Sequence, residues 1–353
     1  MTAAPPRRLA LVVIARDEAP RLGRLLDSVR PWVDDMLVLD TGSADGTARI
    51  AAEHGARVEH FAWCDDFAAA RNHALALANA DWHLVLDADE WLISGGEALQ
   101  ALRDTPPDVV GALQLRDRFD LNATSQGEAI AWLSRVLPGA VRYAGRVHEQ
   151  PQHHLPVRRL PLVIGHDGYV GERLAAKRGR NRQLLTQALA DAPDDAYLWY
   201  QLGKDCAVYD EHDAAETAFA RACALPAAVE SPWGLDLVVR RLFGLKCLGR
   251  HADAMDFAQT QMNAGAESPD FFFAIGDLLL DLAASQPEQA EELLPMIESA
   301  WQQCLALGER PEQAGAVAGR GSYLAAHNLA VVLEGTGRSA EAAALRAAHP
   351  RPC

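Results

Sequence analysis

The sequence predicts two domains of different class: an α/β domain with a mostly parallel sheet over residues 1–180, and an all-α domain of helical repeats over residues 181–353. Short apolar runs alternate with helical patterns in the first part, whereas helical periodicity is continuous from about Lys177 onward. The length of 353 residues fits two domains of ordinary size. The charge also differs, because residues 1–180 hold 21 basic and 24 acidic side chains, whereas residues 181–353 hold 12 and 24.

The α/β class follows from the order of strands and helices in the first part. Short aliphatic runs predict buried strands at residues 9–14, 36–39, 58–61 and 84–86. Helical spacing of apolar residues predicts helices between them, over residues 18–30, 45–53 and 65–79. Because strands joined by helices form right-handed crossovers, this order predicts a parallel sheet.

Ligands of such sheets bind beyond the carboxyl ends of the strands, here at residues 15–18, 40–45 and 87–90. The loop after the first strand reads ARDE, so the glycine-rich dinucleotide fingerprint is absent, and the sequence also lacks a P-loop. These absences argue against a hydride-transferring enzyme and against a P-loop nucleotidase.

Asp87 and Asp89 form the sharpest chemical feature of the sequence. In an extended segment they share one face, and two close carboxylates with diphosphate oxygens are a usual environment for Mg²⁺ or Mn²⁺. The alternative interpretation is a solvated acidic turn. The position directly after a buried strand favours the metal site.

Asp40 and Arg71 are further candidates for contact with a nucleotide. A carboxylate at Asp40 can accept the imide N–H of uracil, although Ser43 or Asp45 in the same loop could simply cap the next helix. Arg71 interrupts an apolar helix and could face a base or a diphosphate. Its alternative role is to pair with Asp65 or Asp66.

Four sequence blocks in order resemble family 2 glycosyltransferases of the GT-A fold. They are residues 13–18 (VIARDE), 39–47 (LDTGSADGT), 65–72 (DDFAAARN) and 86–90 (LDADE). The resemblance is strongest to bacterial members that join this domain to tetratricopeptide-like helices, among them lipopolysaccharide-core glucosyltransferases and sublancin-type peptide S-glycosyltransferases. It covers residues 8–180 well, and the remainder only as a repeat class.

The resemblance implies a role for each matching position. Ala15 and Glu18 would line the nucleoside pocket, Asp40 would bind uracil, and Arg71 would lie beside it. Asp87 would lie near the ribose and Asp89 would be the more direct metal ligand. Two later segments, residues 145–149 (GRVHE) and 164–169 (IGHDGY), imply Glu149 as catalytic base and His166 as metal ligand, with His148, His153 and His154 as competitors for the latter. Trp132 and Arg135 could face the acceptor, and core packing is the alternative for Trp132.

The second part matches the 34-residue tetratricopeptide pattern in places. Trp199, Leu202 and Gly203 followed by Ala215 and Phe219 fit one unit, and residues 248–258 and 327–347 fit two more. Residues 271–308 are helical but depart from the pattern. Stacked helix pairs leave a groove for a peptide or protein partner, and self-association into a homodimer is an equal possibility.

Charge and cysteine usage limit the remaining possibilities. The formal net charge of −15 argues against a nucleic-acid partner, which would need a basic surface. The six cysteines are scattered without a Cys-x-x-Cys pair, and the apolar run from Leu9 to Ala15 is too short to cross a membrane. These observations predict a cytoplasmic protein with reduced thiols and no transmembrane segment.

The sequence as a whole predicts a metal-dependent, inverting glycosyltransferase with a UDP-sugar donor and Mn²⁺ or Mg²⁺ as cofactor. The acceptor would be a hydroxyl or thiol of a peptide, protein or glycolipid such as a lipopolysaccharide core. Two alternatives remain, an inactive scaffold protein and a sugar-nucleotide nucleotidyltransferase. The latter class needs a glycine-rich basic signature after the first strand, where this chain has none.

Overall fold

The computed structural model describes residues 6–122, 125–169, 179–229 and 231–351. The chain divides into two units, Met1–Leu184 and Leu185–Cys353, whereas the sequence placed the domain boundary after residue 180. The first unit is α/β and the second is helical, so the predicted fold classes are confirmed.

The first unit is built from ten strands and four α-helices among the described residues. The strands are β1 (Leu9–Ala15), β2 (Asp35–Asp40), β3 (Arg57–His60), β4 (Trp82–Asp87), β5 (Glu90–Ser94), β6 (Val110–Asn122), β7 (Ser125–Pro138), β8 (Arg142–Ala144), β9 (Gln150–Gln152) and β10 (Val157–Tyr169). The helices are α1 (Ala19–Val29), α2 (Thr47–Glu53), α3 (Phe67–Ala78) and α4 (Glu97–Ala101), with short 3₁₀ turns at Arg30–Trp32 and Leu102–Asp104. Helix α6 (Arg180–Asp191) leads into the second unit.

The main sheet has the strand order β3-β2-β1-β4-β7-β6-β10-β5. Strands β3, β2, β1 and β4 are parallel, as their sequence predicted. Beyond β4 the sheet becomes mixed, because β7 runs antiparallel to both β4 and β6, whereas β6 and β10 are parallel. Strand β5 closes this edge antiparallel to β10.

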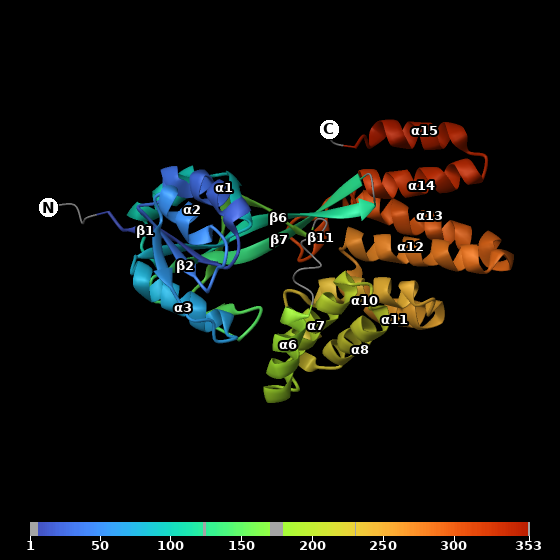
Figure 1. The fold of residues 1–353 in the computed structure, drawn as a ribbon. Helices are drawn as coiled ribbons and strands as arrows, with labels where there is room; N and C mark the ends of the chain where they lie inside the picture. The colour runs from blue at the N-terminus through green and yellow to red at the C-terminus, as the bar shows by residue number, and fades with distance from the viewer. Residues whose placement is uncertain (1–5, 123–124, 170–178, 230, 352–353) are drawn as a thin grey trace. The chain divides into compact units, whose positions relative to one another are not determined.

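Strand β1 is buried on both faces, which explains its continuous apolar sequence. Leu11 and Val13 belong to a core shared with the leucines of α1, whereas Ala10 and Val12 belong to a second core beneath α3. Figure 1 shows α1 and α3 on opposite faces of the sheet.

Helix α3 faces the sheet mainly with alanines. Ala70 and Ala74 are fully buried, and Ala78 is almost so. The helix begins where Asp66 accepts a hydrogen bond from the Ala69 amide at 2.8 Å, and it ends at Asn79, whose φ is +44°. Small side chains allow this helix to lie close to the sheet.

His83 in β4 is expected to make the first unit sensitive to acid. Its Nε2 accepts a hydrogen bond from the Ala80 amide at 3.3 Å, and its Nδ1 has no hydrogen-bond partner among the described residues. Burial, with a contribution from Arg142, lowers the pKa of His83 to about 4. The unfolded chain therefore takes up this proton first, and stability falls as pH drops from about 6.5 towards 4, by on the order of 3 kcal/mol in total.

Urea denaturation of the wild type and of His83→Gln at pH 7.5 and pH 4.5 tests this. The variant should lose less stability between the two pH values, because it lacks the titrating group. Equal losses in both proteins would rule out His83 as the cause.

The second unit consists of consecutive helix pairs. Its α-helices are α7 (Ala196–Val208), α8 (His212–Cys223), α9 (Pro226–Val229), α10 (Gly234–Cys247), α11 (His251–Gly265), α12 (Pro269–Ser285), α13 (Ala290–Leu307), α14 (Tyr323–Gly335) and α15 (Ser339–Ala348), with a 3₁₀ turn at Pro287–Gln289 and a short strand β11 (Ala316–Val317). Residues 271–308, which depart from the repeat pattern, form the pair α12 and α13. The region therefore continues the helix-pair architecture despite its unusual sequence.

Close packing of aromatic rings on glycines joins the helices of a pair. A Cβ atom on Gly203 would lie 2.3 Å from the ring of Phe219, and one on Gly276 would lie 2.7 Å from the indole nitrogen of Trp301. Both rings are fully buried. The first contact joins α7 to α8 and the second joins α12 to α13, so the off-pattern pair uses the same device as the recognisable one.

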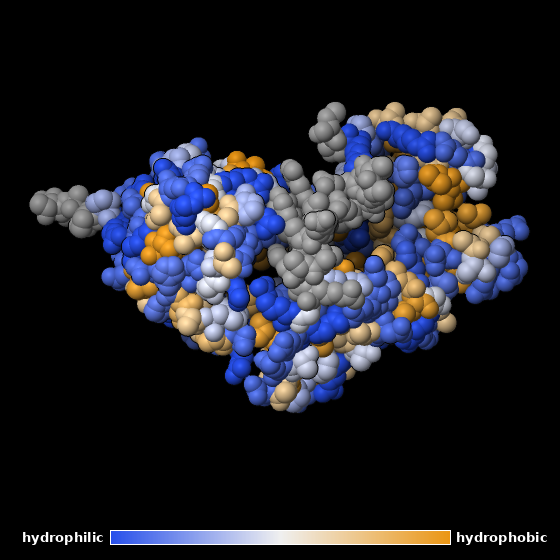
Figure 2. All heavy atoms as spheres, viewed as in Figure 1, coloured by the Kyte–Doolittle hydropathy of each residue, from blue (hydrophilic) through white to orange (hydrophobic). Residues whose placement is uncertain are grey.

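The visible surface of the helical unit is largely hydrophilic, with separate apolar side chains among the polar ones (Figure 2). The large apolar residues exposed there, among those described, are Phe243, Met262, Leu280, Met296 and Val331. In the described part of the chain, no helix combines the length and apolar character needed to cross a membrane.

Candidate active site

The carboxyl ends of β1, β2 and β4 bring three predicted site residues to one edge of the sheet. Ala15 pairs with Asp40 across β1 and β2, and Ile14 pairs with Asp87 across β1 and β4. Ala15 and Asp40 are buried, with 4% and 3% of their surface exposed. The sheet register therefore places the loop after β1 between the two acidic loops.

Asp40 organises the loop that follows β2. Its Oδ1 accepts hydrogen bonds from the amides of Gly42 and Ser43, at 2.7 and 2.8 Å. The Thr47 amide bonds instead to Asp45, at 2.8 Å, so Asp45 rather than Asp40 serves the start of α2. Oδ1 of Asp40 thus shapes the turn, and no hydrogen bond to Oδ2 comes from the residues that the structure describes.

The loop after β1 is held against this turn. The Glu18 amide donates to the Thr47 hydroxyl at 2.8 Å, and the Glu18 carboxylate forms an ion pair with Arg21 at 2.5 Å. Asp17 adopts a positive φ of +56°, and its amide donates to the hydroxyl of Ser43. A non-glycine residue in this conformation is uncommon, and such residues gather at binding sites.

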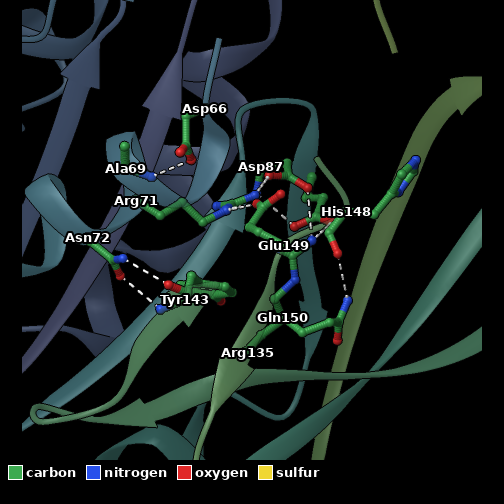
Figure 3. Close-up of polar contacts among 11 residues, drawn as sticks. Asp66, Ala69, Arg71, Asn72, Asp87, Arg135, Tyr143, His148, Glu149 and Gln150 are labelled. Carbon is green, nitrogen blue, oxygen red and sulfur yellow. Dashed lines mark hydrogen bonds and ion pairs between the residues drawn. The ribbon is translucent and has the colours of Figure 1, made fainter. Parts of the chain in front are cut away.

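Arg71 lies at the centre of a buried ion cluster (Figure 3). It is 5% exposed, its Nη2 lies 2.6 Å from Oδ1 of Asp87, and its Nε donates to Glu149. The alternative of pairing with Asp65 or Asp66 is wrong, because Asp66 caps α3 and Asp65 accepts a hydrogen bond from Trp63. Burial disfavours a charged guanidinium, but the two carboxylates raise the pKa of Arg71 far above its usual value.

Asn72 connects this cluster to β8. Its side-chain amide donates to the Tyr143 carbonyl at 2.9 Å and accepts from the Tyr143 amide at 2.8 Å. These two bonds tie α3 to the strand that precedes Glu149 (Figure 3). Arg71 Nη1 and the Tyr143 hydroxyl are both buried without a hydrogen-bond partner among the described residues. Buried donors without partners are costly, so they mark a place where a ligand could bind.

Asp87 is shared by two arginines. Arg135 of β7 approaches its Oδ2 at 2.8 Å, while Arg71 holds Oδ1. Despite burial, the two guanidinium groups hold the pKa of Asp87 well below its usual range. Arg135, which the sequence analysis expected to face the acceptor, contacts Asp87 in the structure. Trp132 is partly exposed and lies under the guanidinium of Arg159, 4.6 Å from the ring centre.

Glu90 completes the cluster and was not singled out from the sequence. It is 3% exposed, accepts a hydrogen bond from the Asp87 amide at 2.8 Å, and lies 3.6 Å from Arg135. Burial raises the pKa of Glu90 to about 7, opposed by the charge of Arg135 and reinforced by that of Asp87. Its position directly after the acidic motif was the only available signal.

Asp89 belongs to a different set of contacts from Asp87. The reason given for pairing them, a shared face of an extended segment, is wrong, because residues 88 and 89 form a turn between β4 and β5. Oδ2 of Asp89 instead lies 3.4 Å from Nε2 of His166, whose Nδ1 lies 2.9 Å from Asp117. Burial lowers the pKa of His166, but hydrogen bonds to the two carboxylates outweigh this and raise it to about 10.

The competing histidines lie elsewhere. The ring of His153 bonds to the carbonyl of Leu155 at 3.1 Å. His148 has a φ of +51°, and its ring projects away from Arg71 and Asp87 (Figure 3). His166, in contrast, lies next to Asp89 of the acidic motif.

The predicted donor set for a divalent metal fits in part. Asp89 and His166 offer an oxygen and a nitrogen close together, a combination that suits Mn²⁺ when diphosphate oxygens and water complete the shell. Both oxygens of Asp87 are in contact with arginine. Among the described residues, no three acidic, histidine or cysteine side chains gather as a ready-made metal site.

The mostly parallel sheet, with acidic loops at the carboxyl ends of its strands, agrees with the predicted GT-A fold. Residues 10–151 match the model of glycosyl transferase family 2. This part of the chain is thus similar to family 2 glycosyltransferases, and helix pairs follow it.

Three relatives agree with this assignment. A TPR repeat-containing protein of Synechococcus elongatus is 41% identical over 213 residues, which are 56% of this chain and 51% of the relative. The SPbeta prophage-derived glycosyltransferase SunS of Bacillus subtilis is 25% identical over 220 residues, 58% of this chain and 50% of SunS. An uncharacterized glycosyltransferase of Rickettsia felis is 35% identical over 85 residues, 24% of this chain and 30% of the relative. The chain spans about half the length of the first two.

Proposed function

We propose that this protein transfers a sugar from a UDP-sugar to a hydroxyl or thiol of a peptide, protein or glycolipid, with inversion and with the help of a divalent metal. The observation that carries the proposal is the convergence, at one sheet edge of a family 2 domain, of the Asp40 turn and the cluster of Arg71, Asp87 and Glu149. Beside them, Asp89 in the turn after β4 lies 3.4 Å from His166 in β10.

The nucleoside is assigned to the loops after β1 and β2. Oδ2 of Asp40 accepts the imide N–H of uracil, a charge-assisted hydrogen bond that also selects the base. Ala15 and Glu18 line the adjacent wall, and the short side chain of Ala15 leaves room for the nucleoside. Asp87 orients Arg71 and Arg135 near the ribose and the diphosphate.

The leaving diphosphate is assigned to the part of the site beside Arg71 and Tyr143. Arg71 Nη1 and the Tyr143 hydroxyl, which lack partners among the described residues, can donate to its oxygens. Asp89 and His166 would hold Mn²⁺ or Mg²⁺ there, and the bound ion would stabilise the charge that develops on the leaving group.

Glu149 is proposed as the base that deprotonates the acceptor. Arg71 holds its Oε1, which orients the carboxylate and leaves Oε2 to take the proton. Attack from the face opposite the leaving group in one displacement gives inversion at the anomeric carbon. The helix pairs of the second unit are proposed to bind the acceptor or a second copy of the chain.

The proposal is tested by melting the purified protein with UDP, Mn²⁺, both, or neither. Stabilisation by UDP that depends on Mn²⁺ is expected. A panel of UDP-sugars with a lysate of the host as acceptor source should then release UDP and give a mass-shifted product. An inactive scaffold would show neither effect, and a nucleotidyltransferase would instead turn over UTP and a sugar phosphate with release of pyrophosphate.

A further inference from the structure

We propose that Asp117 is a positioning residue that orients the imidazole of His166 towards Asp89. This inference rests on the proposed function, because it concerns the pair assigned to the metal. Neither the sequence motifs nor the comparisons single out Asp117. The contacts of three neighbouring strands carry the argument.

Strand register places Asp117 beside His166. In the parallel pair of β6 and β10, His166 is directly opposite Asp117, so their side chains lie on the same face of the sheet. On the other side of β10, His166 is opposite Glu90 of β5. The histidine therefore stands between two acidic neighbours contributed by different strands.

Glu90 and Asp117 differ in whether their carboxylate contacts the imidazole ring of His166. Glu90 contacts the Asp87 amide through Oε2 and Arg135 through Oε1. Asp117 instead places Oδ1 2.9 Å from Nδ1 of His166. Asp117 is thus the neighbour that holds the ring, and Glu90 belongs to the arginine cluster.

The second ring nitrogen of His166, Nε2, points towards Asp89, the other proposed metal ligand. Nε2 of His166 lies 3.4 Å from Oδ2 of Asp89, and both side chains are largely buried, with 14% and 8% of their surface exposed. A carboxylate that accepts a hydrogen bond from Nδ1 fixes the ring orientation, and once Nε2 gives up its proton to a bound metal the proton on Nδ1 stays with that carboxylate. Asp117 therefore contacts His166, and His166 in turn contacts Asp89, so the acid at one end supports the two proposed metal ligands.

The test measures Mn²⁺ affinity directly, by titration calorimetry in the presence of UDP, on the full chain. Asp117→Ala is expected to weaken Mn²⁺ binding by about 10- to 100-fold, the usual effect of removing such a support. Asp117→Asn, which keeps an oxygen acceptor at the same place, should weaken it less. The matched control is Glu128→Gln, because Glu128 lies on the neighbouring strand β7 and pairs with Arg116 at 3.7 Å. This control should bind Mn²⁺ like the wild type.

A double-mutant cycle distinguishes a positioning effect of Asp117 on His166 from general damage to the structure. If Asp117 acts through His166, adding Asp117→Ala to His166→Gln should cause no further loss of Mn²⁺ affinity. Long-range ¹H–¹⁵N NMR of the wild type and Asp117→Asn should also show a changed His166 tautomer or protonation state without any metal.

Two outcomes would overturn the inference in distinguishable ways. If the wild type binds Mn²⁺ with UDP and Asp117→Ala binds it equally well, only the role of Asp117 fails. If the wild type binds neither UDP nor Mn²⁺, the proposed function fails and this inference falls with it.

Discussion

Replacing Arg71 with alanine is expected to destabilise the first unit by about 3–5 kcal/mol and to abolish sugar transfer. Arg71 is 5% exposed and contacts both Asp87 and Glu149, so its removal leaves the nearly buried Glu149 and the partly exposed Asp87 with one fewer positive charge. Arg135 can compensate only Asp87 and Glu90, which it already contacts. Glu149 would lose the partner that orients it.

Urea denaturation followed by far-ultraviolet circular dichroism measures this loss. Arg49→Ala is the matched control, because Arg49 forms an exposed ion pair with Glu53 and should change stability by less than about 1 kcal/mol. Arg71→Lys should fall between the two, since one ammonium group cannot reproduce a guanidinium that contacts two carboxylates through different nitrogens. Wild-type stability in Arg71→Ala would contradict the central place given to this residue.

Replacing Asp89 with asparagine should remove metal-dependent binding of UDP while leaving the fold intact. Asp89 contacts His166, so the neutral amide of asparagine keeps the shape of the side chain but weakens the proposed ligand pair. Transfer should fall by at least about 100-fold, because a metal contributes several kcal/mol of charge stabilisation to a leaving diphosphate. Melting with UDP and Mn²⁺, alongside initial rates of UDP release, measures both effects.

Asp87→Asn provides the informative comparison for Asp89→Asn. It should lower the stability of the first unit as well as activity, because Arg71 and Arg135 would both lose a charged partner. The two neighbouring acids should thus separate into one that supports the fold and one that supports metal binding. A full Mn²⁺-dependent stabilisation by UDP in Asp89→Asn would refute its assignment.

Much of the first unit could be predicted because its strands are buried on both faces. Such strands appear in the sequence as uninterrupted apolar runs, and a polar residue at the end of one, such as Asp40 or Asp87, is easily located. The mixed half of the sheet gave no comparable signal. The contact of Asp87 with Arg135 spans 48 residues, and that of His166 with Asp117 spans 49, so both depend on strand register that no local pattern encodes.

In the helical unit, too, the sequence predicted the helices better than the contacts between them. The pair α7 and α8 could be recognised because Gly203 and Phe219 occupy the expected repeat positions. The pair α12 and α13 escaped recognition because its glycine and aromatic ring, Gly276 and Trp301, occur in a sequence interrupted by Pro287 and Pro295. Helix propensity identified the elements there, but the packing determines which residues meet.

The alanines of α3 have a consequence for how this site can change during evolution. Ala70 and Ala74 lie between the helix backbone and the sheet, so their size sets the thickness of that layer. Arg71 belongs to the same helix, so the distance between the helix and the sheet also determines how closely its guanidinium approaches Asp87. A larger side chain at either alanine would lift the guanidinium away from its carboxylates. The volume of two buried alanines thus controls the distances within a charged site.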